Sequence, residues 1–560
     1  MRLSTDETRE DELALQTIAA AAAASITVFD TARAYGRDEA DLGHNERLLA
    51  RALRRADVAA GARIVSKGGM TRPGGAWVPD GRAKAIRADC EASLTALDGL
   101  PIDLYLVHAP DPRTPWRTTV RALASLAEEG LVRRVGVANV NRGQLDEALE
   151  HAPVAAVQVA LSALDDRALR GGVVERCAEQ GVAVIAHSPL GGPRRVGRLM
   201  RHEALAGVAA ARGATPGEVA LAWLLDLSPA VVAIPGARRP ESARSAARAA
   251  ALALEDADRD ALARAFGRPQ PARAAAARGD GEVVVVMGIP GAGKTRIGRD
   301  LAARGYVRLN RDERGGTLRE VADALEEALA AGERRVVLDN TYLTRAARSY
   351  VLEAAARHGL PARCVWLDTP LAQAQVNLVE RMLERFGSLL GPEELRQHAR
   401  REPGVHAPTT QMRTQRELEP PSTDEGFAAV EQVAFSRASR ADGRPGVLVA
   451  AAALAQPGWE DAVPHADAPH LVFDWRPDAG EDALGPEAAR LTAVVSGPVD
   501  TAVCPHPGGA PICWCRPPLP GLPLAFARRR DVDLARSTLV GTSAAHRTLA
   551  TTLGASYLAV

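Results

Sequence analysis

The sequence predicts an α/β protein in three parts: a (β/α)8 barrel, a doubly wound parallel sheet around a phosphate-binding loop, and a small Rossmann-like α/β domain. Three observations lead to this prediction. Over the first 268 residues, short apolar runs alternate with helical stretches, as in parallel βα units. At Val283–Thr295, four valines run into a glycine-rich loop that a helical pattern follows. A further set of apolar runs, starting with GVLVAAAAL, follows residue 445.

Length and composition favour several domains in one cytoplasmic chain. At 560 residues the protein exceeds the size at which a single hydrophobic core stops growing. Lys+Arg and Asp+Glu number 69 each, so contact with a polyanion has to be local. No apolar run reaches about 18 residues, and the charged start MRLSTDETRE lacks the core of a signal peptide, so no membrane partner is expected. Six cysteines do not make a disulfide framework.

The first 268 residues contain seven clear strand candidates, and MRLS at the start is expected to be a clipped first strand that brings the number to eight. In a (β/α)8 barrel, the chemistry lies at the carboxyl ends of the strands. Polar residues occur at these ends or close to them: Asp30 in ITVFD, Lys67 in RIVSK, His108 in IDLYLVH, Asn139 in VRRVGVAN, Gln158 in VAAVQVAL and Ser188 in VAVIAHS. The seventh run, PAVVAIPG, ends near Gly236.

The pieces FDTARAYG, SKGG, LVHAP, VGVAN, VQVAL, AHSPLGG and AIPGARRPE resemble the aldo-keto reductases across about 250 residues. The resemblance implies that Asp30, Tyr35, Lys67 and His108 are catalytic. A phenol with an ordinary pKa near 10 donates a proton poorly at neutral pH, so Lys67 is expected to lower the pKa of Tyr35. Asp30 would pair with Lys67, and His108 would orient the carbonyl of a small substrate.

The same resemblance implies NADP(H) as cofactor. Asn139 and Gln158 would hold the nicotinamide amide, with Ser188 beside them. Arg238 and Arg239 either clamp a 2′-phosphate or are exposed arginines at a helix start, and the residues favour neither reading. Departures from the family are His187 in place of a stacking aromatic, Ala246 in place of an Asn, and an N-terminally clipped barrel.

A linker is expected at 269–281, followed by a P-loop domain at 282–440. The loop Gly288-x-x-x-x-Gly293-Lys294-Thr295, with Gly291 inside it, would wrap its backbone N–H groups around the phosphates of ATP. Lys294 would reach the β/γ-phosphates, and the hydroxyl of Thr295 would hold Mg²⁺.

The segments GIPGAGKT, GYVRLNRD, VVLDNT, RSYVLEAA and PPSTDEGF resemble the kinase half of the polynucleotide kinase/phosphatases over roughly 150 residues. By this resemblance Asp312 is the general base on a 5′-hydroxyl; the alternative is an Asp that caps a helix. Asp339 and Asn340 hold Mg²⁺ or substrate, or simply end a strand. Arg381 and Arg385 contact the transferring phosphates or lie on a solvated helix face.

The last domain, 445–560, contains four soft metal ligands within twelve residues: Cys504, His506, Cys513 and Cys515. This set suits a closed, tetrahedral Zn²⁺ site. The stretch from CWCRPPLP onward resembles haloacid-dehalogenase (HAD)-type phosphatases that carry a zinc loop. The carboxylates of that family are absent, because GVLVAAAAL has no acid and Asp474 falls on a later strand, so an inactive phosphatase fold is expected.

Three functional hypotheses follow from these domains. The first combines carbonyl reduction with ATP-dependent phosphorylation of the 5′-hydroxyl ends of RNA or DNA. The second replaces the polynucleotide by a small metabolite, which the absence of net basic charge favours. The third is a regulatory scaffold with inactive domains. The sequence does not determine the oligomeric state.

Overall fold

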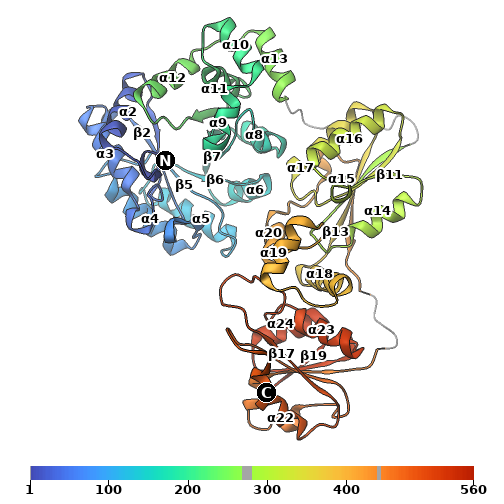
Figure 1. Ribbon diagram of the computed structural model, residues 1–560. Coiled ribbons are helices and arrows are strands. Elements are labelled where there is room, and N and C mark those ends of the chain that lie inside the picture. Colours follow the sequence, from blue (N-terminus) through green and yellow to red (C-terminus); the bar gives the residue numbers. More distant parts are fainter. Residues whose placement is uncertain (1, 268–280, 438–442) are drawn as a thin grey trace. The chain divides into compact units, whose positions relative to one another are not determined.

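The structure is a computed structural model that describes residues 2–267, 281–437 and 443–560 (Figure 1). The chain divides into two compact units, Met1–Pro271 and Ala272–Val560. The linker expected at 269–281 lies outside the described residues except for Gly281. Within the described ranges, no helix is long and apolar enough to cross a membrane.

The N-terminal unit is built on seven parallel strands that form one curved, barrel-like sheet in chain order. The strands are β1 (Val28–Asp30), β2 (Arg63–Gly68), β5 (Leu104–Val107), β6 (Val135–Ala138), β7 (Val154–Ala160), β8 (Ala183–His187) and β9 (Val231–Ile234). Each coincides with one of the seven apolar runs. A two-stranded antiparallel hairpin, β3 (Met70–Thr71) and β4 (Val78–Pro79), follows β2 and has no counterpart among the expected elements.

The expectation of a strand at MRLS was wrong. Residues Arg2–Thr5 form a helix, α1, because the buried Ser4 hydroxyl accepts a hydrogen bond of 2.8 Å from the Asn45 amide and thereby ties the segment to α3 (His44–Arg55). In the described sheet, β1 and β9 are therefore edge strands, and Val28 and Val232 on them are about half exposed.

Helices surround the outside of this sheet, as Figure 1 shows, and the main core of the unit lies between the two layers. The remaining helices are α2 (Asp11–Ala23), α4 (Ala83–Ala96), α5 (Trp116–Glu128), α6 (Arg142–His151), α7 (Arg167–Arg170), α8 (Val173–Gln180), α9 (Gly192–Met200), α10 (Glu203–Arg212), α11 (Pro216–Asp226), α12 (Pro240–Ala250) and α13 (Asp256–Phe266). Inside the curved sheet, Val65, Leu106 and Ala138 form a small second core. The polar residues at the carboxyl ends of the strands lie beyond this core, at the open end of the barrel-like sheet.

The second unit begins with a parallel sheet in the order β11-β12-β10-β13-β14. Its strands are β10 (Glu282–Met287), β11 (Val307–Leu309), β12 (Arg335–Asp339), β13 (Ala362–Asp368) and β14 (Ala429–Ala434). Its helices are α14 (Lys294–Ala302), α15 (Arg311–Arg314), α16 (Leu318–Ala330), α17 (Arg345–Arg357), α18 (Leu371–Phe386), α19 (Pro392–Arg401) and α20 (Pro408–Glu417). Because Val286 pairs with Asp339, the glycine-rich loop and Asp339 lie at the same edge of the sheet.

The C-terminal part of this unit has its own parallel sheet, ordered β17-β16-β15-β18-β19. The strands are β15 (Val447–Ala450), β16 (His470–Trp475), β17 (Val499–Cys504), β18 (Thr538–Gly541) and β19 (Ser556–Ala559), with helices α21 (Trp459–Ala462), α22 (Gly485–Thr492), α23 (Gly521–Arg530) and α24 (Ala544–Leu553). One hydrophobic core joins α18 to the cysteine loop and α23, so the two sheets of this unit share buried packing.

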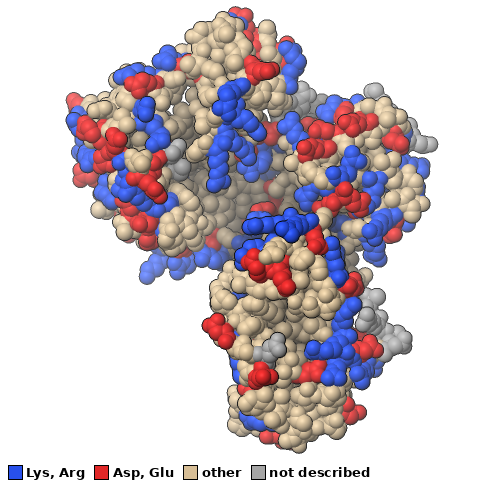
Figure 2. Space-filling view, viewed as in Figure 1, with Lys and Arg blue, Asp and Glu red and all other residues tan. Residues whose placement is uncertain are grey.

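Surface charge is mixed in sign. On the face seen in Figure 2, basic and acidic side chains are interspersed over both units, in line with the equal totals of 69. This arrangement gives no single-sign field over the described surface.

Candidate active sites and metal centre

A buried ion pair lies at the carboxyl ends of β1 and β2. The Lys67 side chain is completely buried, and its Nζ donates to both carboxylate oxygens of Asp30 at 2.7 Å. A third bond of 2.8 Å goes to the Thr31 carbonyl. Burial by itself lowers the pKa of Lys67, but the charges and hydrogen bonds of Asp30 and Tyr35 together raise it above the ordinary value. Lys67 is therefore a fixed cation in this pocket.

Tyr35 lies against this cation. Its ring centroid is 4.8 Å from Lys67 Nζ, and the residue is buried. Burial raises the pKa of Tyr35, and this effect exceeds the lowering by Lys67. Lys67 thus lowers the pKa of Tyr35 as expected, but the net shift is upward, because desolvation of a phenolate outweighs a cation that Asp30 already neutralises.

His108 completes the predicted group of four. Its ring stands edge-on to Tyr35, with centroids 5.6 Å apart. Burial, followed by the charges of Lys67, His187 and Arg72, lowers the pKa of His108 well below its ordinary value. The imidazole is thus neutral at pH 7, and its buried Nδ1 has no hydrogen-bond partner. A neutral imidazole carries one N–H, which suits it to orient a carbonyl.

The carboxamides and their neighbours lie at the adjacent strand ends. Gln158 Nε2 donates to Asp30 at 2.7 Å, and Asn139 Nδ2 donates to the His108 carbonyl at 2.9 Å. His187 bridges Asn139 Oδ1 (3.0 Å) and the Ser188 hydroxyl (3.2 Å). Asn139 and Ser188 both have positive φ, 57° and 52°, a strained conformation that persists only where the surroundings demand it. The predicted residues are therefore brought together with the catalytic four.

Arg238 and Arg239 lie at the start of α12, away from that hydrogen-bond network. Arg238 forms an ion pair of 3.1 Å with Asp6, and Arg239 is exposed at the N-cap of the helix.

Two residues of the β3–β4 hairpin line the same site and were missed from the sequence. Trp77 stands edge-on to Tyr35 and His108, with centroids 6.3 Å and 5.8 Å away. The guanidinium of Arg72 stacks on the Trp77 indole at 3.8 Å. Strands of two residues leave no periodic pattern, so the only available signal was an aromatic after the Pro-Gly-Gly turn.

The glycine-rich loop has the conformation its pattern predicts. Gly288, Gly291 and Gly293 have φ of 150°, 86° and 97°, in the region that favours glycine. A Cβ on Gly291 would lie 2.4 Å from the Ala374 carbonyl oxygen, so the loop also needs glycine for close packing against α18. Thr295 is exposed in the first turn of α14, where its hydroxyl is open to a ligand.

Lys294 folds back over this loop. Its Nζ donates to the carbonyls of Gly288 and Ile289, each at 3.0 Å. Burial, and then the positive charge of Arg381, lowers the pKa of Lys294 to about 8. These carbonyls carry no net charge, so the ammonium lacks a full counter-charge of the kind a phosphate supplies.

Asp312 is not a helix cap. In α15 the cap is Asn310, whose side chain accepts from the Glu313 amide, while the Asp312 carboxylate remains 46% exposed. Its charge raises the pKa of Lys294, so it acts at the loop. Asp339, by contrast, is buried and held by Arg308 at 2.8 Å and by Asn310. Asn340 accepts from the Arg311 amide at 2.8 Å.

The two predicted arginines of α18 differ in their surroundings. Arg381 acts on the pKa of Lys294 and lies along Gly404, whereas Arg385 forms an ion pair with Glu402. Contact of these arginines with a phosphate stays a prediction, and Arg381 is the better placed of the two because the guanidinium of Arg385 already has a carboxylate partner.

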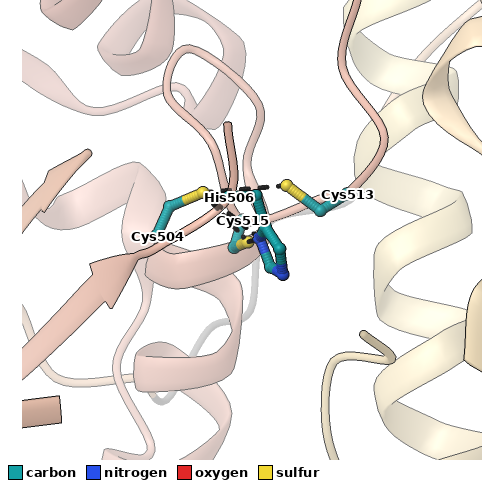
Figure 3. Close-up of side chains that lie close together, drawn as sticks. All are labelled: Cys504, His506, Cys513 and Cys515. Atoms are coloured by element: carbon teal, nitrogen blue, oxygen red, sulfur yellow. Dashed lines mark hydrogen bonds between the residues drawn. The ribbon is translucent and has the colours of Figure 1, made fainter. Parts of the chain in front are cut away.

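The four soft ligands converge at one point, as Figure 3 shows. Their ligand atoms all lie within 4.8 Å of one another: Cys504, His506, Cys513 and Cys515. Separations of 3.7 Å (Cys504–Cys513 sulfurs), 3.3 Å (Cys504–Cys515 sulfurs) and 3.2 Å (His506 Nδ1–Cys515 Sγ) approach the edges of a small tetrahedron. With Zn–S bonds of about 2.3 Å, sulfurs around zinc are separated by roughly 3.8 Å.

The cysteine loop is connected to the glycine-rich loop through Trp514. This fully buried side chain donates from Nε1 to the His406 carbonyl at 2.9 Å. His406 lies close enough to Lys294 that burial and then this lysine lower its pKa to about 4. A metal that orders Cys513 and Cys515 would also fix the residue between them.

Near the carboxyl end of β16 in the C-terminal sheet, Asp474 bonds the two residues that follow it. Its carboxylate accepts from the Trp475 amide at 2.8 Å and from Arg476 at 2.9 Å. The strand before it, β15, ends in alanines. The described residues thus offer no free strand-end carboxylate at β15 for a phosphatase mechanism.

Comparison with known proteins adds two family matches. The model of the Aldo/keto reductase family matches residues 1–265, and that of an AAA domain matches residues 283–403. An uncharacterized oxidoreductase of Schizosaccharomyces pombe is 29% identical over 252 residues, which cover 44% of this chain and 78% of the relative.

The aldo-keto reductase str7 of Strobilurus tenacellus is 30% identical over 258 residues, covering 41% of this chain and 74% of the relative. A solved aldo/keto reductase of Klebsiella pneumoniae, in complex with NADP and acetate, is 26% identical and covers 48% of this chain and 90% of that one, with a TM-score of 0.41.

Proposed function

The chain belongs to the aldo/keto reductase family, and from this premise we propose that its N-terminal unit reduces small carbonyl compounds with NADP(H). The observation that carries the proposal is the buried Lys67–Asp30 pair against Tyr35, with neutral His108 edge-on to the same ring. The cofactor fits the residues present, because two carboxamides lie beside the catalytic four: Gln158 bonds Asp30, and Asn139 bonds His187.

In this proposal the nicotinamide supplies the hydride that reaches the carbonyl carbon. Tyr35 gives its phenolic proton to the developing alkoxide, and Lys67 stabilises the phenolate that remains. His108 donates its single N–H to the carbonyl oxygen and orients it. Asn139 and Gln158 hold the amide of the cofactor.

The decisive assay follows oxidation of NADPH in the presence of an aldehyde. Replacing Tyr35→Phe is expected to lower kcat by about 100-fold or more, since a positioned general acid contributes at least that factor. Tyr306→Phe is the matched control, because Tyr306 bonds Glu282 in the other unit. Equal rates for wild type and Tyr35→Phe would refute the proposed role of this tyrosine.

For the second unit we propose ATP-dependent phosphorylation of a hydroxyl, with the 5′-hydroxyl end of RNA or DNA as acceptor. The glycine conformations, the Lys294 ammonium without a full counter-charge and the exposed Asp312 carboxylate support it. Asp312 accepts the hydroxyl proton while the γ-phosphoryl is transferred in line, and Lys294, Arg381 and a Mg²⁺ held by Thr295 balance the phosphate charge. A small metabolite as acceptor is the competing outcome of the same assay.

We further propose that the four-ligand cluster binds Zn²⁺ and that the HAD-like fold around it is catalytically silent. Each of the three cysteine sulfurs lies within 4 Å of another ligand atom of the cluster, so the three thiols cannot all ionise without a cation between them. Three sulfurs and one nitrogen are a donor set that suits zinc. The cluster then acts as a structural cross-link.

Metal analysis tests this cross-link. Wild-type protein is expected to carry about one equivalent of zinc, as a closed four-ligand site does, and Cys513→Ser is expected to lose it and to unfold at lower temperature. Cys364→Ser, a buried cysteine of β13, serves as control. Because Trp514 joins the cluster to His406, zinc removal is also expected to weaken ATP binding. Unchanged zinc content in Cys513→Ser would contradict the proposed site.

A further inference from the structure

Arg72 is a buried cation beside the carbonyl site with unused hydrogen-bond donors. Only 5% of the residue is exposed. Its Nη2 donates to the Arg37 carbonyl at 2.9 Å, but Nε and Nη1 are buried without any acceptor. In the described part of the chain no carboxylate forms an ion pair with this guanidinium, although the Arg72 backbone amide donates to Glu39 at 2.7 Å.

The arrangement is costly in free energy, because buried donors are almost always paired in native proteins. Burial lowers the pKa of Arg72, with a partial offset from Asp38, as expected of a cation that lacks a close counter-charge. Unsatisfied buried groups of this kind gather at functional sites, where a ligand supplies the missing partner.

The hairpin loop holds this cation at the catalytic centre. Gly74 and Gly75 have φ of 55° and 80°, so the chain reverses between Arg72 and Trp77 and brings the guanidinium onto the indole. Trp77 in turn touches the rings of Tyr35 and His108 edge-on. The charge of Arg72 is the last of the four causes that lower the pKa of His108, as expected of a cation that lies near this imidazole without bonding it.

We propose that Arg72 is an anion subsite that selects carbonyl substrates bearing a carboxylate or phosphate group. An arginine fork is the side chain best matched to either anion, and both free donors are on this fork. Trp77, 43% exposed, is the outer member of the stack. Because its indole packs on the guanidinium, an anion that reaches the fork has to displace the indole. The inference rests on the proposed carbonyl reduction and names its substrate class.

Matched aldehyde pairs test the proposal. One comparison is para-carboxybenzaldehyde against para-carbamoylbenzaldehyde, and the other is glyceraldehyde phosphate against glyceraldehyde. The pair with the larger ratio of kcat/KM, anionic to neutral, identifies the preferred anion. Wild type is expected to favour the anionic member by about 10-fold or more in kcat/KM, the range of a hydrogen bond to a charged group. In Arg72→Gln this preference disappears through a raised KM, while rates on the neutral members stay within about 3-fold.

Two variants sharpen the result. Arg72→Lys keeps a charge without the fork and is expected to retain part of the preference. Arg82→Gln is the matched control, because Arg82 is exposed and pairs with Asp80 just beyond the hairpin. If Arg72→Gln slows the neutral and anionic members equally, Arg72 only supports the loop and the proposal is overturned.

Binding separates this inference from the reductase function itself. Calorimetry with benzoate against benzamide, and with glycerol phosphate against glycerol, needs no turnover. If no aldehyde is reduced but the anions bind wild type and not Arg72→Gln, the subsite stands and the reductase proposal fails. If the anions do not bind wild type, and no anionic aldehyde is preferred, the subsite is refuted.

Discussion

Replacing Lys67→Met is expected to abolish carbonyl reduction and to lower the free energy of unfolding of the N-terminal unit by about 3–5 kcal/mol. The methionine removes the cation that stabilises the phenolate of Tyr35. It also leaves the Asp30 carboxylate buried without its cation, although the Gln158 amide still donates to it. Loss of one partner from a buried ion pair is among the most destabilising substitutions.

A double variant distinguishes the two effects. Adding Asp30→Asn to Lys67→Met removes the uncompensated charge, so most of the lost stability is expected to return, whereas activity stays about 10³-fold below wild type. Urea unfolding measures stability, and NADPH oxidation measures activity. If Lys67→Met unfolds at the same urea concentration as wild type, the Lys67–Asp30 ion pair does not stabilise the N-terminal unit.

Replacing Lys294→Ala is expected to abolish transfer of labelled phosphate to a 5′-hydroxyl oligonucleotide, with a loss on the order of 10³-fold or more. The reason is local. Among the described residues the ammonium bonds the two loop carbonyls alone, and burial with Arg381 lowers its pKa to about 8, so it gains most from an incoming phosphate. Removing it breaks no ion pair in the described ranges, and the fold should therefore persist.

The arginines of α18 make this experiment more specific. Arg381→Ala is expected to reduce transfer more than Arg385→Ala, because Glu402 already holds Arg385. Arg396→Ala, an exposed position paired with Glu393, is the control. Asp312→Asn tests the general base. Equal labelling by wild type, Lys294→Ala and Asp312→Asn would eliminate the kinase proposal. ATP turnover on a sugar or polyol, without labelling of the oligonucleotide, would instead identify a small metabolite as the phosphoryl acceptor.

Most of the N-terminal strands were predictable because each is a short apolar run that ends close to a polar residue. The same rule failed for the shortest segments. MRLS is too short to carry a pattern, and its helix depends on the Ser4–Asn45 hydrogen bond, a contact between distant segments. The β3–β4 hairpin has two residues per strand, so Arg72 and Trp77 escaped notice although they line the site.

Residue type and local spacing alone determined three features of this protein: the glycine-rich loop with Lys294, the four-ligand cluster, and the polar residues at successive strand ends. Each of these features depends on residues within a few positions of one another, so a single sequence is enough to predict them. Tertiary structure decided which of Arg381 and Arg385 acts on the loop, and that burial raises the pKa of Tyr35 despite Lys67. It also decided that Nε and Nη1 of Arg72 lack an acceptor. Each of these depends on desolvation or on a partner far away in the chain, and neither is encoded in local spacing.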